Sequence, residues 1–483
     1  MLLPLRKIGG NALSLLTSDV MNRATSFVLY VLVGRRLGAH EFGQLSLALT
    51  LFYIFQVFAA AGMKTLIIRQ VTKDRSQTRL YFINGCLIVT CTSIVSFGAL
   101  FAFVRLMHYP ADTTLVTLLV AVGLFPYAIS VVCEGIFQAW EQMRYIAYVN
   151  IPVNLAKVGA AFLLLSTNHG LYAVVMVLLF AFGAIAIFEI GVVLKAFPRL
   201  PAPIDFGFCR NTLRSAITFL GIDSTIAVMS SLNILLLSKM ATEIEVGLYS
   251  AATQLMVPLL LVYQNIAQSI FPLMCRTVEP GLRTLKRMSE QVIEVLLILA
   301  VPAVAGLYFL GDRLLSVLYK NPAFLQAFPA LRIAAWILIS QVFTSVLGQV
   351  LVASHRERVT LRIVAVDMLV NLLVGWPLIH FFGLRGAAIA LLLTRLVDCV
   401  QHYIPVSKLF SGIPVGKIVW KPVIAAACMV AYLLMDISRA DFLVGVSSVL
   451  VYSAALFALT IWTSGGFRQF REKCLFLLSA KGS

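Results

Sequence analysis

Long apolar stretches alternate with short polar connectors along the whole chain. A helix needs about 20 mainly apolar residues to cross a bilayer, and fourteen stretches of the sequence meet that requirement. They centre on 13–34, 44–63, 80–103, 114–137, 146–166, 171–194, 213–238, 247–274, 290–310, 327–353, 361–381, 386–407, 418–435 and 442–463. The connectors leave no room for a soluble domain, so the pattern predicts an all-α polytopic membrane protein with about fourteen transmembrane helices.

The composition agrees with this prediction. Of the 483 residues, 60% are hydrophobic and 12% are charged, whereas soluble domains average about 45–50% and about 25%. The excess apolar surface needs a lipid bilayer as its solvent, which excludes a soluble enzyme and a cytosolic nucleic-acid-binding protein. We therefore expect the bilayer as a partner and no nucleic acid.

The basic residues are distributed unevenly over the connectors. With the N-terminus in the cytoplasm, the inner connectors and tails carry 26 of the 38 Lys and Arg residues, and the outer connectors carry 8. Cytoplasmic loops are rich in Lys and Arg, and a missed helix would invert every later loop. The bias therefore predicts that both termini are cytoplasmic. It also accounts for the net charge of +17 without a polyanionic partner.

The chain contains an internal repeat whose copies have the same membrane orientation. At an offset of 204 residues the matching pairs are Arg35/Lys239, Glu41/Glu245, Gly43/Gly247, Ser46/Ser250, Ala48/Ala252 and Asp19/Asp223. A second pairing joins 169–173 to 382–386 at an offset of 213. Parallel repeats with a substrate path between two lobes are a transporter architecture. We expect an N-terminal six-helix lobe (1–200), a C-terminal six-helix lobe (201–410), two additional helices (411–463) and a cytoplasmic basic tail (464–483).

A motif after the first span points to a known family. The segment RRLGAHEFGQL at 35–45 resembles the R-x-L-G-x-x-x-F-G-x-Y signature of polysaccharide transporters, with Leu45 in place of Tyr. Three further segments resemble the family pattern, GIFQAWEQMR at 135–144, VGLYSAA at 246–252 and FGLRGAA at 382–388. Together they are similar to the Wzx-type flippases of the multidrug/oligosaccharidyl-lipid/polysaccharide exporter superfamily.

This resemblance implies a flippase of the bacterial cytoplasmic (inner) membrane. Its substrate would be an undecaprenyl-pyrophosphate-linked oligosaccharide, moved from the cytoplasmic to the periplasmic leaflet by alternating access, with polysaccharide assembly enzymes as possible partners. A lipid II flippase and a drug or cation antiporter of the same superfamily are the closest alternatives. A membrane glycan polymerase or transferase is disfavoured, because the outer loops are short and contain no DxD or paired carboxylates.

Charged residues within spans are costly and mark candidate functional sites. Asp19 and Arg23 are four residues apart, so an ion pair within one helix is expected. Asp223 matches Asp19 in the repeat but has Ala227 where an Arg would pair with it, so it needs another partner, a proton or a cation. We hypothesise that one of these carboxylates couples transport to an H+ or Na+ gradient.

The remaining candidates concern an anionic substrate. Lys157 lies in the middle of a span and is suited to a pyrophosphate, or alternatively pairs with Glu189 or Asp367. Asp367 is itself a further candidate for the substrate or the coupling ion, alongside Asp19, Arg23, Lys157 and Asp223. Vestibule candidates are Arg35, Arg36, Lys64, Gln264 and Asn265. For Lys64, cytoplasmic positive charge is the simpler account, and Glu134 is assigned to a helix end. The cysteines and histidines show no disulfide or metal-ligand spacing, so no metal, catalytic residue or organic cofactor is expected.

Overall fold

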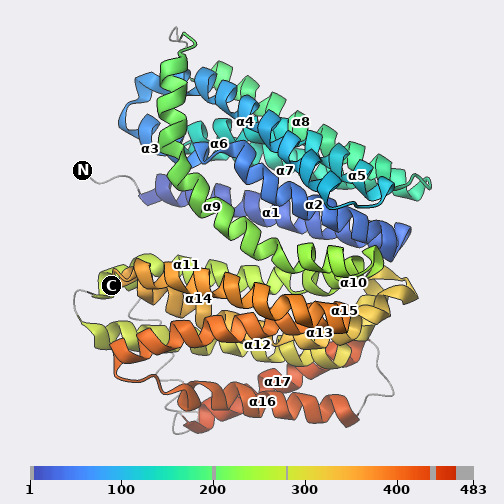
Figure 1. Ribbon diagram of the computed structural model, residues 1–483. Helices are drawn as coiled ribbons and strands as arrows, with labels where there is room; N and C mark the ends of the chain where they lie inside the picture. Colours follow the sequence, from blue (N-terminus) through green and yellow to red (C-terminus); the bar gives the residue numbers. More distant parts are fainter. Residues whose placement is uncertain (1–4, 198–202, 279–280, 436–441, 464–483) are drawn as a thin grey trace. The chain divides into compact units, whose positions relative to one another are not determined.

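The computed structural model describes residues 5–197, 203–278, 281–435 and 442–463, and regular structure in these ranges is helical (Figure 1). The predicted all-α membrane fold is confirmed. The chain divides into two compact units, unit 1 with residues 1–251 and 318–324 and unit 2 with residues 252–317 and 325–483. The predicted basic tail, 464–483, lies outside the described residues. The boundaries predicted from the repeat divide the chain differently and stay a prediction.

Unit 1 contains the N-terminal helices. They are α1 (Leu5–Leu37), α2 (Ala39–Ala60), α3 (Met63–Lys73), η1 (Arg75–Gln77), α4 (Thr78–Leu106), α5 (Ala111–Val122), α6 (Leu124–Ala139), α7 (Arg144–Ser166), α8 (Leu171–Ala196), α9 (Phe206–Met240) and most of α10 (Glu243–Gln254). Local chemistry defines several boundaries. The Asp205 side chain accepts a hydrogen bond from the Phe208 amide and caps α9, as N-cap aspartates commonly do.

The connector between α3 and α4 has a similar cap. Asp74 accepts hydrogen bonds from the hydroxyl and amide of Ser76 and from the Gln77 side chain. Hydrogen bonds to the charged form favour ionisation, so the Ser76 hydroxyl, its amide and Gln77 together lower the pKa of Asp74. The charged carboxylate therefore stabilises the start of η1.

Unit 2 contains the C-terminal helices. They are α11 (Val257–Val278), α12 (Leu282–Tyr319), η2 (Pro322–Ala327), α13 (Phe328–Ala335), α14 (Ile337–Ala353), α15 (Glu357–Phe410), α16 (Val415–Met435) and α17 (Phe442–Thr463), apart from residues 318–324. α16 and α17 pack side by side (Figure 1). α15 is two helices joined at Gly383, whose φ of 51° and ψ of −125° are non-helical.

The number of membrane spans depends on how broken helices are counted. In the described ranges, 11 helical runs are long and apolar enough to cross a membrane, or 12 if α10 and α11, bent by 43°, form one span. Arg358–Phe410 counts as one run although Gly383 breaks it, and α1 is not among the runs. α1 carries the charged residues Asp19 and Arg23. The count of fourteen stays a prediction.

Helix boundaries recur at the offsets found in the sequence. α2 begins at Ala39 and α10 begins at Glu243, 204 residues later. The break between α5 and α6 at Gly123 recurs 213 residues later at Trp336, between α13 and α14. The two halves of the duplication therefore share helix breaks as well as residues.

The paired glycines of the repeat lie against each other within unit 1. A Cβ atom on Gly43 would lie 1.9 Å from the Glu243 carbonyl oxygen, and a Cβ atom on Gly247 would lie 2.2 Å from the Ala39 carbonyl oxygen. Each glycine thus meets the backbone four residues before its repeat partner. No side chain fits at this reciprocal crossing of α2 and α10, which explains why both copies of the motif have glycine there.

Phe42, the aromatic residue of the same motif, forms the centre of a ring cluster in unit 1. Its ring centroid lies 5.5 Å from that of Tyr30, 5.8 Å from that of Tyr319 and 5.6 Å from that of Phe324, all at edge-to-face angles. Such geometry is favourable for aromatic pairs, and Phe42 is fully buried. The motif therefore has a structural role at the start of α2.

Candidate functional site

The ion pair expected on α1 is present. Arg23 Nε lies 3.1 Å from Asp19 Oδ2, and both side chains are about half exposed. Asp223, the repeat partner of Asp19, lies on α9 with its side chain exposed. In the described part of the chain it has no ion pair. Arg35 and Arg36 lie exposed in the last turn of α1, where cations complement the helix dipole.

Lys157 lies half-buried on α7 and its partner is local. Its Nζ donates to Asn154 Oδ1 at 2.6 Å, and Asn154 Nδ2 donates to the Asn150 carbonyl oxygen at 2.8 Å. Among the described residues of unit 1 it does not pair with Glu189, one of the two alternatives considered from the sequence. Asp367, the other alternative, lies in unit 2, and that pairing stays a prediction. The ammonium group retains donors for an anion.

Lys64 and Glu134 form a pair that the sequence did not reveal. Lys64 Nζ, on α3, lies 2.6 Å from Glu134 Oε2, on α6, and both side chains are largely covered. Lys64 also interacts electrostatically with Glu189 on α8. Glu189 is fully buried, and the described residues contain no cation within ion-pair distance of its carboxylate, which interacts with the Ser130 side chain. The three residues bring one cation and two carboxylates into the interior of unit 1.

A second buried polar cluster lies in unit 2, on the two halves of α15. Asp367 is 2% exposed, and its Oδ1 accepts a hydrogen bond from Gln401 Nε2 at 2.9 Å. Asp398 lies 2.8 Å from His402 Nδ1 and 3.5 Å from Arg395 NH1. Arg395 and Asp398 lie three residues apart in sequence, so they share one face of the helix. Asp398 and His402 are four residues apart in sequence, and this helical spacing is the feature from which their contact could have been inferred.

The cluster leaves Asp367 in a distinctive position. Asp398 contacts the Arg395 guanidinium and the His402 imidazole, whereas Asp367 has an amide donor and no ion pair within the described ranges. Asn371, one turn further along α15, is 2% exposed, and no described residue forms a hydrogen bond with its Oδ1. Two oxygen acceptors are therefore available one helical turn apart. The described residues contain no group of His, Cys, Asp and Glu with metal-binding geometry.

The polar residues predicted on span eight lie on α11. Gln264 is exposed and Asn265 is half-buried, while the neighbouring Tyr263 is fully buried with its hydroxyl lacking a partner. Exposure of two amide side chains on an apolar helix fits a polar lining. Their assignment to a vestibule stays a prediction.

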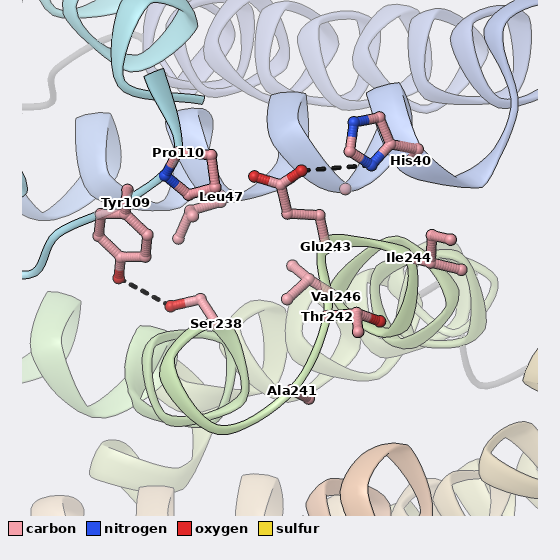
Figure 2. A pocket seen from close by; sticks show the side chains of 11 residues that line it. His40, Leu47, Tyr109, Pro110, Ser238, Ala241, Thr242, Glu243, Ile244 and Val246 are labelled. Carbon is pink, nitrogen blue, oxygen red and sulfur yellow. Dashed lines mark hydrogen bonds and ion pairs between the residues drawn. The ribbon is translucent and has the colours of Figure 1, made fainter. Parts of the chain in front are cut away.

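A cavity of about 310 Å³ lies in unit 1 where the connection between α9 and α10 meets α2 (Figure 2). Glu243 interacts there with His40 at 3.2 Å and accepts a hydrogen bond from Thr113. Across the cavity the Tyr109 and Ser238 hydroxyls are 2.8 Å apart, and burial raises the pKa of Tyr109 although that bond opposes the shift. These polar groups satisfy one another, so the network holds the α9–α10 connection against α2.

The fold is that of known membrane transporters. The lipid II flippase MurJ in an inward closed conformation matches with a TM-score of 0.76 at 13% identity, covering 92% of this chain and 99% of that one. An inward-facing multidrug resistance transporter of the MATE family matches with a TM-score of 0.66 at 13% identity, covering 81% of this chain and 94% of that one. A transporter of the MOP superfamily from Pyrococcus furiosus matches with a TM-score of 0.59 at 13% identity, covering 84% of this chain and 95% of that one.

Sequence comparison places the chain more closely. Residues 8–278, more than half of the chain, match the model of the polysaccharide biosynthesis protein family, and the chain belongs to this family. The probable low-salt glycan biosynthesis flippase Agl15 of Haloferax volcanii is 21% identical over 470 residues, which is 94% of either protein. The family resemblance inferred from the motifs is confirmed.

Proposed function

We propose that this protein is a flippase that moves an undecaprenyl-pyrophosphate-linked oligosaccharide from the cytoplasmic to the periplasmic leaflet of a bacterial inner membrane. The observation that carries the proposal is the family match over residues 8–278. The end-to-end similarity to a probable glycan biosynthesis flippase supports it. Alternating access between two lobes would move the glycan, and polysaccharide assembly enzymes would supply and consume the lipid-linked chain.

Lys157 is our candidate for the pyrophosphate. An ammonium group is a compact charge that suits phosphate oxygens. Within the described ranges Lys157 donates to the neutral amide of Asn154 and has no carboxylate partner. Arg35, Arg36, Lys64, Gln264 and Asn265 are proposed to line the vestibule. Lys64 is the weakest member of this set, because Glu134 already neutralises it.

Asp367 is our candidate for the coupling ion, H+ or Na+. A buried carboxylate without a cationic partner is costly as an anion, so it gains from taking up a proton or a cation. Asp19 is engaged by Arg23, and Asp223 is exposed. Asp367 alone among the three is both buried and without a cation of its own in the part of the chain described.

A flipping assay tests both the proposed transport activity and the proposed coupling role of Asp367. The purified chain in vesicles is given a fluorescent lipid-linked oligosaccharide, with and without an H+ or Na+ gradient. We expect flipping by the unaltered chain, loss of the gradient dependence in Asp367→Asn, and retention of it in Asp74→Asn, a matched change in an exposed connector. Flipping that responds equally to the gradient in both variants would remove Asp367 from the coupling role.

Deletion of the protein tests the substrate in cells. We expect the undecaprenyl-linked repeat unit to accumulate on the cytoplasmic face. The fold likeness to MurJ makes lipid II the alternative substrate, and accumulation of lipid II instead would favour that reading. Unchanged glycan and lipid pools would contradict the proposal.

A further inference from the structure

Unit 2 contains a cavity of about 490 Å³ that combines two arginines with three aromatic rings. Its lining comes from the end of α12, from α13 and from the second half of α15. The residues that define it are Tyr308, Phe328, Arg332, Trp336 and Arg385, and we call it the Arg332–Arg385 pocket. None of these residues belongs to the polar clusters described above.

Arg332 is held in a fixed orientation. Its Nε donates to the Tyr308 carbonyl oxygen at 3.0 Å. Its guanidinium carbon lies 4.7 Å from the ring centroid of Tyr308 and 4.4 Å from that of Phe328. Both contacts are close enough for favourable cation–π interaction. The bond through Nε leaves both terminal nitrogens free to donate, and no carboxylate in the described residues engages them.

Arg385 is placed by the break in α15. Gly383 takes the positive φ that reverses the helix direction, and Arg385 follows two residues later. At Gly386 a Cβ atom would lie 1.9 Å from the Leu378 carbonyl oxygen, so the two halves of α15 approach through their backbones. The Arg385 side chain is exposed. Within the described ranges it too has no ion-pair partner.

The chemistry of this pocket is specific to the second copy of the repeat. At the offset of 213 residues, Arg332 corresponds to Leu119, Trp336 to Gly123 and Arg385 to Tyr172. The helix break is shared by the two copies, but the cationic residues are not. The first copy forms the same helix break without arginines, so Arg332 and Arg385 are not required for the backbone conformation. Their presence in the second copy therefore needs another explanation.

A phosphate group explains both arginines. A guanidinium binds phosphate oxygens through paired N–H donors, and two guanidinium groups without carboxylate partners at one pocket leave their donors to be satisfied by an anion. Trp336 is 48% exposed, and Trp and Tyr concentrate at the membrane interface, at headgroup level. The charge pattern of the connectors places 313–320 and 382–386 at the outer ends of their spans.

We propose that the Arg332–Arg385 pocket binds the phosphate headgroup of an anionic lipid in the outer leaflet. The arginines bind the phosphate, and the apolar part of the lining, Pro329, Ile333 and Leu392, faces the start of the acyl chains. This site is separate from the proposed transport function, because it requires no glycan carrier and no coupling ion.

Lipid retention by the full-length protein in detergent tests the proposal, with phosphatidylglycerol and phosphatidylcholine as probes in native mass spectrometry. We expect phosphatidylglycerol to be preferred by the unaltered protein. In Arg385→Gln we expect about tenfold weaker retention, the effect of losing one charged hydrogen-bonding group. Arg332→Gln should weaken it at least as much. Arg385 is exposed, so we expect R385Q to affect folding less than R332Q does. Thermal unfolding of both variants checks that they are folded.

Arg105→Gln is the matched control. Arg105 also lies at a predicted outer helix end with its guanidinium carbon 5.4 Å from an aromatic ring centroid, that of Phe101, but it lines neither cavity described here. We expect R105Q to retain phosphatidylglycerol like the unaltered protein. Equal retention of the two lipids, or equal loss in R105Q and R385Q, would overturn the proposal. Displacement of the lipid by millimolar inorganic phosphate would show a soluble phosphate as the ligand and would overturn the lipid assignment.

These results are independent of the flipping assay. Loss of lipid preference in R385Q with intact flipping would support the pocket and leave the transport proposal standing. Absence of flipping with an intact lipid preference would contradict only the transport proposal.

Discussion

At the scale of single residues, the charged pairs differ in how far apart their members lie in sequence. Asp19 and Arg23 meet because residues four apart on a helix share a face. Lys64 and Glu134 are 70 residues apart and meet because α3 packs on α6. The first pair is half exposed and the second is largely covered. The two pairs differ mainly in their carboxylates, since the Asp19 side chain is 49% exposed and that of Glu134 is 21% exposed.

This difference predicts an ordering of stability effects. We expect Lys64→Gln to destabilise the protein more than Arg23→Gln, because K64Q leaves Glu134 without its cation near the buried Glu189. In a double-mutant cycle, K64Q and E134Q should show a coupling energy of about 1 kcal/mol, limited by the partial exposure of Lys64. Thermal unfolding in detergent measures both. Additive effects of K64Q and E134Q would show that the pair does not contribute.

At the scale of helices, close backbone approach determines which positions accept a side chain. The α2–α10 crossing has glycine on both sides, and each glycine contacts the backbone of the other helix. The two glycines occupy equivalent positions of the repeat copies, and both lie in the same crossing of α2 and α10.

The α2–α10 crossing predicts that alanine substitutions at glycines inside and outside it differ strongly in their effect on stability. Gly43→Ala should destabilise the protein by several kcal/mol, about the 3 kcal/mol upper range for overpacking, because its Cβ would lie 1.9 Å from the Glu243 carbonyl oxygen. Gly98→Ala, within α4, has nothing within 4 Å and should be neutral or slightly stabilising.

Thermal unfolding of the two alanine variants provides the measurement, and Gly247→Ala should behave like Gly43→Ala. Equal melting temperatures for G43A and G98A would mean that α2 and α10 do not approach as described.

At the scale of the whole molecule, hydrophobicity and charge predict a membrane orientation. The connectors predicted to be cytoplasmic are rich in Lys and Arg, and those predicted to be outer are nearly balanced in charge. The family match and the MurJ-like fold place the chain among multi-pass membrane proteins. The direction in which it is inserted stays a prediction from the charge distribution.

Cysteine labelling tests this orientation. In a variant without the eight native cysteines, Lys320→Cys should react with an impermeant maleimide in cells whose outer membrane is opened. Arg356→Cys should react only after the inner membrane is permeabilised, because it lies on the predicted cytoplasmic side. Both side chains are exposed, so accessibility to the reagent is comparable. The reverse labelling pattern would invert the orientation.

Much of the fold was predictable because it depends on periodic or local features. The apolar stretches predicted helices, and the motif at 35–45 predicted the family that the comparison confirmed. The repeat offsets come from the sequence, and the structure showed that helix breaks recur at them. The Asp19–Arg23 and Arg395–Asp398 pairs were predictable for the same reason, since their members lie within one helical turn.

The tertiary structure decided the partners of the remaining charges. Lys64 meets Glu134 and Asp367 meets Gln401, although the members of these pairs are 70 and 34 residues apart in sequence. Arg332 and Arg385 are also distant in sequence and line the same cavity. Their proximity depends on which helix faces pack, and a hydrophobic pattern leaves that choice open because most faces of a membrane helix are apolar. The sequence by itself thus determined that this is a helical, duplicated membrane protein of a polysaccharide family. Only packing decided which intramembrane charges have an ion-pair partner among the described residues and which have none.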